Sequence, residues 1–137
     1  MTGILSKLNI PNGVYFSNNN LWVRKNIYGL IKVGINELVL IQNKNLIIDK
    51  IVEIETTVKK GDFIFKAVSE KGITQYYSPI NGMIKFINPN LQRKKIRDPY
   101  ENDWIIIMLA ENFTKDKCSL FSVENFKKIN SQYFNRS

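Results

Sequence analysis

Short β-rich segments separated by turn residues run along most of this chain, and this pattern constrains the fold more than any other feature of the sequence. The segments are rich in β-branched and aromatic residues and lie between clusters of Asn, Gly and Pro, which is typical of strands joined by turns. They occupy residues 15–16, 21–24, 29–33, 46–55, 62–68, 73–77, 82–87 and 104–109. Because no long helical pattern separates them, the chain is predicted to be mostly β, in a sandwich or barrel rather than in βαβ units.

Two helices are predicted beside the strands. Asn36 can cap a short helix over residues 38–41, because its side-chain oxygen can accept a backbone N–H that has no partner in the first turn. Near the C-terminus, helical spacing extends over residues 122–134, with Ser122 as the N-cap. The apolar residues at this spacing are Phe126, Ile129, Tyr133 and Phe134. We expect the aromatic ones to anchor an amphipathic helix on the β-structure.

The length and composition of the chain limit its organisation. Its 137 residues, 44% of them hydrophobic, suffice for one domain with a real core, and a single domain over residues 1–137 is predicted. No run of about 18 apolar residues indicates a membrane span, and residues 1–8 do not resemble a secretory signal. A lone cysteine, Cys118, excludes an internal disulfide and suits a reducing compartment. We expect a cytoplasmic protein, mitochondrial if the source is a eukaryote, with Cys118 buried or half-buried as a small apolar residue.

Histidine is absent from the chain, which limits the chemistry that its side chains can perform. Catalytic dyads and triads with an imidazole base are excluded, as are zinc sites that need histidine or several cysteines. An enzyme with its own active site is therefore disfavoured, and no metal site is expected. The net charge of +8 permits binding to nucleic acid, an anionic membrane or an acidic protein. Joint enrichment in Lys, Asn and Ile offers a simpler explanation, an A/T-rich genome.

One segment predicts a lysine presented at a hairpin tip. Two β-rich runs flank the sequence Ser-Glu-Lys-Gly at residues 69–72. Gly72 can adopt the positive φ that a tight hairpin needs, which places Lys71 at the tip beside Glu70. A lysine there is solvated, stands on a rigid base and is accessible to another protein. An ordinary charged turn residue is the simpler interpretation of the same position.

Four short segments follow one another in a recognisable order: residues 15–24 (YFSNNNLWVR), 33–36 (VGIN), 77–82 (YSPING) and 98–105 (DPYENDWI). Together they resemble the glycine cleavage system H-protein family. The third is similar to the family's Tyr-Ser-Pro-x-x-Gly signature, and the fourth to its Asp-Pro-Tyr-x-x-Gly-Trp-Leu segment. Counted back from the serine of the third segment without a gap, Lys71 falls on the family's lipoylated lysine.

The same segments also have structural interpretations. Gly82 begins the strand after the hairpin, where a positive φ or a close backbone approach is expected. Asp98 begins a turn in which its side chain can accept a hydrogen bond from the following backbone. Trp22 and Trp104 are predicted to be large core residues whose indole N–H groups find partners. On this interpretation Lys71 alone carries chemistry, and the other matched residues hold the scaffold.

The resemblance implies a barrel-sandwich hybrid of the lipoyl/biotinyl-like type, with lipoic acid joined to Lys71 by an amide and with Glu70 and Gly72 forming the cofactor-binding tip. It implies a non-catalytic carrier that shuttles an aminomethyl group in glycine catabolism. The implied partners are glycine decarboxylase, aminomethyltransferase, dihydrolipoyl dehydrogenase and a lipoate ligase or lipoyl transferase. A monomer is expected, and binding to membranes or nucleic acid is not.

Several residues depart from the family pattern and leave other functions open. Val68 stands where the family has an acidic residue before the lysine, and Gln75 stands where it has an Asp after it. One alternative is an H-like protein whose Lys71 stays unmodified, or serves a different lipoate-dependent pathway, as a scaffold or specialised carrier. Another is a protein whose basic surface binds nucleic acid or a different polyanion. Lipoylation of Lys71 separates the carrier from the unmodified scaffold.

Overall fold

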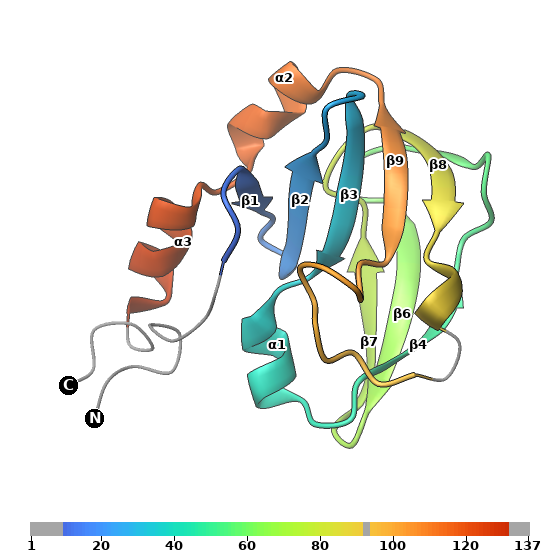
Figure 1. The fold of residues 1–137 in the computed structure, drawn as a ribbon, viewed down its shortest axis with the longest axis vertical. Coiled ribbons are helices and arrows are strands. Elements are labelled where there is room, and N and C mark those ends of the chain that lie inside the picture. Colours follow the sequence, from blue (N-terminus) through green and yellow to red (C-terminus); the bar gives the residue numbers. More distant parts are fainter. Residues whose placement is uncertain (1–9, 92–93, 132–137) are drawn as a thin grey trace.

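The computed structural model describes residues 10–91 and 94–131, which form two β-sheets and several short helices (Figure 1). The larger sheet has six strands in the order β1-β2-β3-β9-β8-β5, and the smaller has three in the order β4-β6-β7. The strands are β1 (Val14–Phe16), β2 (Leu21–Lys25), β3 (Leu30–Ile35), β4 (Ile47–Ile51), β5 (Thr57–Val58), β6 (Phe63–Ser69), β7 (Gly72–Tyr77), β8 (Gly82–Ile87) and β9 (Ile106–Ala110). The helical segments are α1 (Glu37–Gln42), η2 (Pro89–Leu91), α2 (Phe113–Asp116), η3 (Lys117–Ser119) and α3 (Val123–Ile129).

The packing of the two sheets confirms the predicted fold class. Neighbouring strands are antiparallel in both sheets. Their inner faces enclose one buried cluster, to which Val33, Ile64 and Met108 belong. Removing this apolar surface from water stabilises the arrangement. Within the described residues the sheets stay separate and do not close into a barrel. The fold is mostly β and sandwich-like, with a C-terminal helix.

A second apolar cluster lies on the other face of β1 and β2 and holds this helix. Phe16 and Phe126 stack with their ring centroids 4.0 Å apart. Trp22 belongs to the same cluster and is fully buried. Its indole Nε1 donates a hydrogen bond of 3.0 Å to the carbonyl oxygen of Pro99, as a buried indole requires. These contacts confirm Trp22 as a core residue and Phe126 as the anchor of α3.

Both predicted helix caps are confirmed. The side chain of Asn36 accepts a backbone N–H at 3.2 Å at the start of α1. The side chain of Ser122 accepts one at 3.1 Å before α3. Each bond satisfies a donor that the first turn of a helix leaves unpaired. Two of the aromatic residues expected to anchor the C-terminal helix, Tyr133 and Phe134, lie outside the described residues.

Several other predictions are wrong. Trp104 is half-buried instead of lying in the core, because it precedes β9 at the surface. There Lys32 Nζ lies 5.8 Å from the centroid of its ring. Cys118 is exposed, because the neighbouring Asp116 takes the buried position in this turn of the chain. The strand expected over residues 46–55 is shorter, since only Ile47–Ile51 pairs with β6.

Among the helices of the described ranges, none is long and apolar enough to cross a membrane.

Candidate functional site

The β6–β7 hairpin presents the candidate lysine. Ser69 and Gly72 are paired, so the loop consists of Glu70 and Lys71 alone. Gly72 has a φ of +119°, a value that residues with a Cβ rarely adopt. The backbone N–H of Lys71 donates to Ser69 Oγ at 3.2 Å, which closes the turn locally. The predicted tip and the predicted role of Gly72 in the turn are therefore both present in the structure.

The side chain of Lys71 extends from this tip into solvent. The residue is exposed, and its Nζ has no hydrogen bond or ion pair with any residue that the structure describes. Its two neighbours in the turn are exposed as well. A primary amine in this position stands on a rigid base and faces no competing carboxylate, so an enzyme can approach it from several directions.

The tip is fastened to the loop that follows α1. Glu70 donates its backbone N–H to the carbonyl oxygen of Lys44 at 3.4 Å, and its Oε1 accepts a hydrogen bond of 2.6 Å from Asn45 Nδ2. Asn45 has a φ of +61°, which asparagine tolerates better than most residues. Glu70 therefore positions the turn rather than facing the lysine amine. The sequence reasoning identified Glu70 but missed Lys44 and Asn45, because only the tertiary fold brings them to the tip.

The base of the hairpin is held by the Tyr-Ser-Pro segment. Ser78 is buried, and its backbone accepts from the Gly61 N–H at 2.9 Å and donates to the Asp62 oxygen at 2.7 Å. Its hydroxyl donates to the carbonyl oxygen of Ile80 at 2.6 Å. Next to it, burial raises the pKa of Tyr76 to about 12, so the phenol stays neutral inside the sandwich. These bonds fix where β7 leaves the hairpin and where β8 begins.

Gly82 confirms the predicted close approach of two backbones. A Cβ on this residue would lie 2.4 Å from the carbonyl oxygen of Leu109 on the neighbouring strand β9. That oxygen belongs to a paired strand and can move aside only if β8 and β9 separate locally. Glycine is therefore required at this position by contact rather than by a positive φ.

The segment before β9 is organised by a buried carboxylate. Asp103 Oδ2 accepts the backbone N–H groups of Arg97 at 2.8 Å and Asp98 at 2.9 Å, and Lys94 Nζ lies 3.0 Å from Oδ1. Burial acts to raise the pKa of Asp103, but the hydrogen bonds and the ammonium group outweigh it, so the pKa is lowered. The side chain of Asp98 accepts the Asn102 N–H at 3.2 Å, which confirms the predicted turn.

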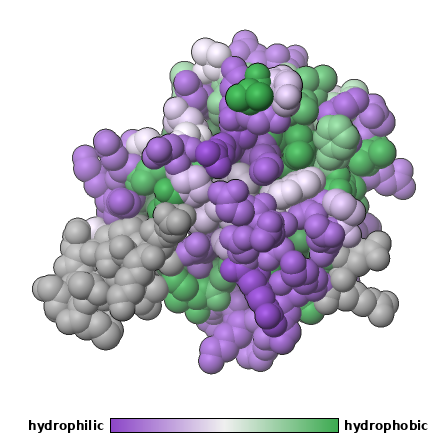
Figure 2. All heavy atoms as spheres, viewed as in Figure 1, coloured by the Kyte–Doolittle hydropathy of each residue, from purple (hydrophilic) through white to green (hydrophobic). Residues whose placement is uncertain are grey.

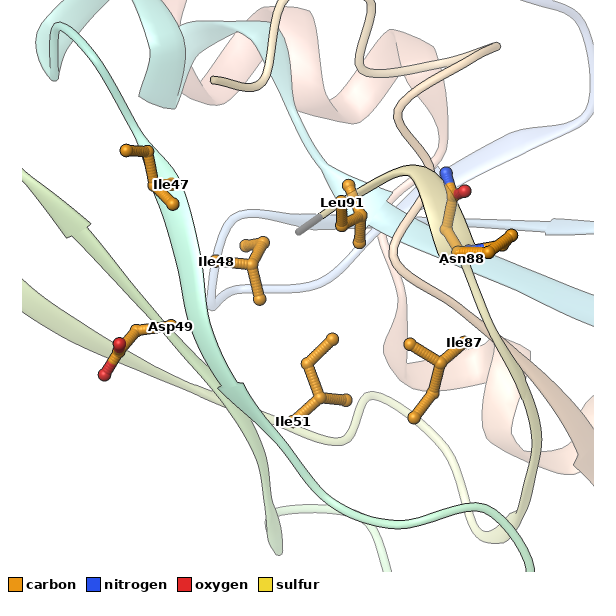
Figure 3. Close-up of a pocket in the computed structure, with 8 residues that line it drawn as sticks. Ile47, Ile48, Asp49, Ile51, Ile87, Asn88 and Leu91 are labelled. Carbon is orange, nitrogen blue, oxygen red and sulfur yellow. The ribbon is translucent and has the colours of Figure 1, made fainter. Parts of the chain in front are cut away.

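An apolar groove of about 600 Å³ opens between the two sheets (Figure 3). Its lining residues are Ile47, Ile48, Asp49, Ile51, Ile87, Asn88, Pro89 and Leu91. In Figure 3, Ile51 of β4 and Ile87 of β8 face each other across it, and Asp49 points away. The groove reaches Ile47, which is in register with Val68 near the hairpin tip. It can therefore receive an apolar group that is attached close by. No local sequence pattern predicts this groove, because its two walls are far apart in the chain.

Comparison with known proteins agrees with this geometry. A sequence model described as "Glycine cleavage H-protein" matches residues 14–133. The chain belongs to the glycine cleavage H-protein family. A glycine cleavage system H protein of Listeria monocytogenes serotype 4b (strain CLIP80459) is 25% identical over 125 residues, covering 89% of this chain and 98% of its own. A "Probable glycine cleavage system H protein" of Pyrococcus furiosus is 26% identical over 120 residues, covering 85% of this chain and 89% of its own.

A solved structure confirms the fold of this H-protein family member independently. The crystal structure of a glycine cleavage system H protein from Mycobacterium marinum superposes with a TM-score of 0.74. The match covers 89% of this chain and 99% of the other, at 18% sequence identity. Family membership and this fold together support a carrier of the H-protein type.

Proposed function

We propose that this protein is a lipoyl carrier that bears lipoate on Lys71 and shuttles an aminomethyl group. The observation that carries the proposal is an exposed amine at the tip of a two-residue turn, unpaired with any residue of 10–91 and 94–131, in a chain of the H-protein family. The carrier would serve glycine decarboxylase, aminomethyltransferase and dihydrolipoyl dehydrogenase, after loading by a lipoate ligase or lipoyl transferase. It would itself catalyse no step. A single domain over residues 1–137, a monomer and a cytoplasmic location stay predictions.

The described residues fit lipoate as an attached group. Lys71 Nζ would supply the nitrogen of the amide, and its exposure leaves room for an enzyme to form that bond. Lipoate would supply a dithiolane, which is the redox and group-carrying chemistry that the chain's own side chains lack. The apolar groove near Val68 offers a surface on which the arm can be sheltered from water. The chain's own contribution is presentation: Asn45 and Gly72 hold the turn so that the amine points outward.

The proposal is tested by the intact mass of the protein purified from its own host, or after co-expression with the lipoate ligase of that host. We expect a mass gain of one lipoyl group in the native protein and none in Lys71→Arg. Lys44→Arg is a matched control, because it keeps the same charge next to the tip and leaves Lys71 in place. An unmodified native protein, in cells where another H protein is fully lipoylated, would contradict the proposal.

A second candidate function is an H-like protein whose Lys71 stays unmodified or serves a different lipoate-dependent pathway. The observation in its favour is that Val68 stands where the family has an acidic residue. Val68 pairs with Ile47 and Ile73 on the neighbouring strands. If the attaching enzyme needs a carboxylate there, Val68→Glu should raise the lipoylated fraction from none to most of the protein. A native protein that is already fully modified would exclude the unmodified form.

A further inference from the structure

Three cationic side chains that have no partner among the described residues lie near the hairpin tip that presents Lys71. Lys44, Lys95 and Arg97 are exposed, and their side chains make no hydrogen bond or ion pair within the part of the chain that the structure describes. Lys66 and Lys94 are neutralised, since Lys66 pairs with Asp49 at 3.2 Å and Lys94 with Asp103 at 3.0 Å. Lys44, Lys95 and Arg97 therefore add positive charge beside the turn, where Glu70 is the neighbouring carboxylate.

The fold brings these residues to the tip from two segments, the loop after α1 and residues 95–97, and Arg97 lines the same hollow as Asn45. The carbonyl of Lys44 accepts the N–H of Glu70. Lys95 forms a β-bridge with Ile47, which is in register with Val68 of the hairpin. Figure 2 shows hydrophilic side chains gathered over the lower part of the molecule, the end at which α1 and the β6–β7 hairpin lie in Figure 1.

A hollow of about 190 Å³ lies between the loop after α1 and the 95–97 segment. Its polar lining is made by Asn43, Asn45, Lys95 and Arg97, and no carboxylate lines it. Amide, ammonium and guanidinium groups are donors to carboxylate oxygens, and a guanidinium can bind one in a bidentate manner. Asn43 Nδ2 already donates to the carbonyl oxygen of Val39 and Asn45 Nδ2 to Glu70 Oε1. Lys95 and Arg97 are therefore the two lining groups that can bind an acidic side chain. Because Asn45 also holds Glu70, such a side chain would sit next to the turn that carries Lys71.

An apolar row completes this face. Ile47, Val68 and Ile73 lie side by side on three neighbouring strands, with Lys95 at the end of the row. The next row, with Ile48 and Ala67, is buried, so Val68 and Ile73 lie on the outer side of the small sheet, whereas Ile47 also lines the groove between the sheets. Ile73 is 65% exposed. Apolar residues beside a cationic rim are the composition of a protein–protein contact.

We propose that Lys44, Lys95, Arg97 and the Ile47–Val68–Ile73 row form a docking face for an acidic patch on the enzyme that loads Lys71. The inference rests on the proposed function, because it assigns this face to the enzyme acting at that lysine. A protein fits better than nucleic acid, because the row offers aliphatic surface rather than the aromatic rings on which bases stack.

The test is the initial rate of Lys71 lipoylation by the lipoate ligase of the source organism, followed by intact mass. We compare the native protein, Lys95→Glu/Arg97→Glu, and the control Lys25→Glu/Lys115→Glu. The control has the same change in charge, at exposed residues at the opposite end of the molecule (Figure 1). The side chains of Lys95 and Arg97 have no partner among the described residues, so folding should be unaffected, which thermal unfolding checks.

At about 50 mM salt, we expect kcat/KM to fall at least about tenfold in the test variant and less than about twofold in the control. Raising the salt to about 300 mM should slow the native protein and leave the test variant nearly unchanged, because screening removes the attraction only where it exists. Equal rates for the two double variants, or a native rate independent of salt, would overturn the docking face and leave lipoylation of Lys71 standing.

Two other outcomes also decide against the inference. If the native protein gains no lipoyl group, the proposed function fails and the docking face fails with it. Fluorescence anisotropy of a labelled single-stranded oligonucleotide tests whether this face binds nucleic acid. If it binds at physiological salt and the same two charge reversals abolish binding without changing the lipoylation rate, the face serves a polyanion instead of an acidic protein.

Discussion

The two sheets are built from the same kind of strand but are constrained in different ways. In the large sheet, contacts fix the identity of individual residues: a Cβ on Gly34 would lie 2.5 Å from the Trp22 indole, and Gly82 abuts the backbone of Leu109. In the small sheet, five of the six residues of β7 are exposed, and the described residues form no further strand beyond it. Close contacts therefore restrict residue identity in the large sheet, whereas the outer strand β7 of the small sheet presents the lysine turn and tolerates change at its exposed positions.

Trp22→Ala is the strongest test of this contrast. The substitution removes a fully buried indole, its contact with Tyr100 and its hydrogen bond to Pro99. We expect the free energy of unfolding to fall by about 3–5 kcal/mol, measured by urea denaturation followed by far-UV circular dichroism. A loss below about 1 kcal/mol would mean that the second apolar cluster does not hold the large sheet.

A smaller effect is expected for Gly82→Ala, matched with Ile73→Ala in the small sheet. The new methyl group at Gly82 would overlap the Leu109 carbonyl, so the β8–β9 pair must separate locally, at a cost of about 1–3 kcal/mol. Ile73 is mostly exposed, and its truncation should change stability by less than about 0.5 kcal/mol. Equal losses in the two variants would remove the distinction between the sheets.

Asp103→Asn should show a pH-dependent loss. The carboxylate accepts two backbone N–H groups and a lysine ammonium, bonds worth about 1–3 kcal/mol when one partner is lost. The pKa of Asp103 is lowered in the folded state. Its stabilisation is therefore complete above the unfolded-state pKa of about 3.9 and is lost as the pH falls through the lower folded-state pKa.

Urea denaturation at a series of pH values measures this effect. The difference between the native protein and Asp103→Asn should be largest near neutral pH and should shrink below about pH 4. Lys85→Met is a control, because it breaks an exposed ion pair with Glu55 and should have little effect at any pH. A difference that grows on acidification would show that the carboxylate is not stabilised in the folded state.

The sequence predicted best those features that depend on neighbours in the chain. The turn at Lys71 followed from Gly72, and the start of α1 followed from Asn36, because a positive φ and an N-cap are local requirements. The assignment of Lys71 to the family's lipoylated lysine also rests on local spacing before Ser78, and it stays a prediction. The close approach at Gly82 was among the alternatives that strand geometry allows.

Features that depend on which segments meet could not be predicted in this way. Trp104 and Trp22 look alike in sequence, and both contact the second apolar cluster. Only Trp22 is fully buried, because Phe126 of α3 and Tyr100 belong to the same cluster and cover it. The hydrogen bond between Asn45 and Glu70 joins residues 25 positions apart. β5 has two residues, too few to show an alternation of apolar and polar positions.

Asn45→Gly gives the smallest and most local of the expected effects. It removes the amide that holds Glu70 while keeping a residue suited to a φ of +61°. Global stability should change by less than about 0.5 kcal/mol, because both side chains are exposed. Amide hydrogen exchange at Glu70, which donates to Lys44, should become about two- to fivefold faster, as expected from losing one modest hydrogen bond. Exchange at Trp22 is the internal control, since its amide lies in the large sheet and should not change. If both amides exchange faster by the same factor, the tip is not a separate local unit and the two sheets open together.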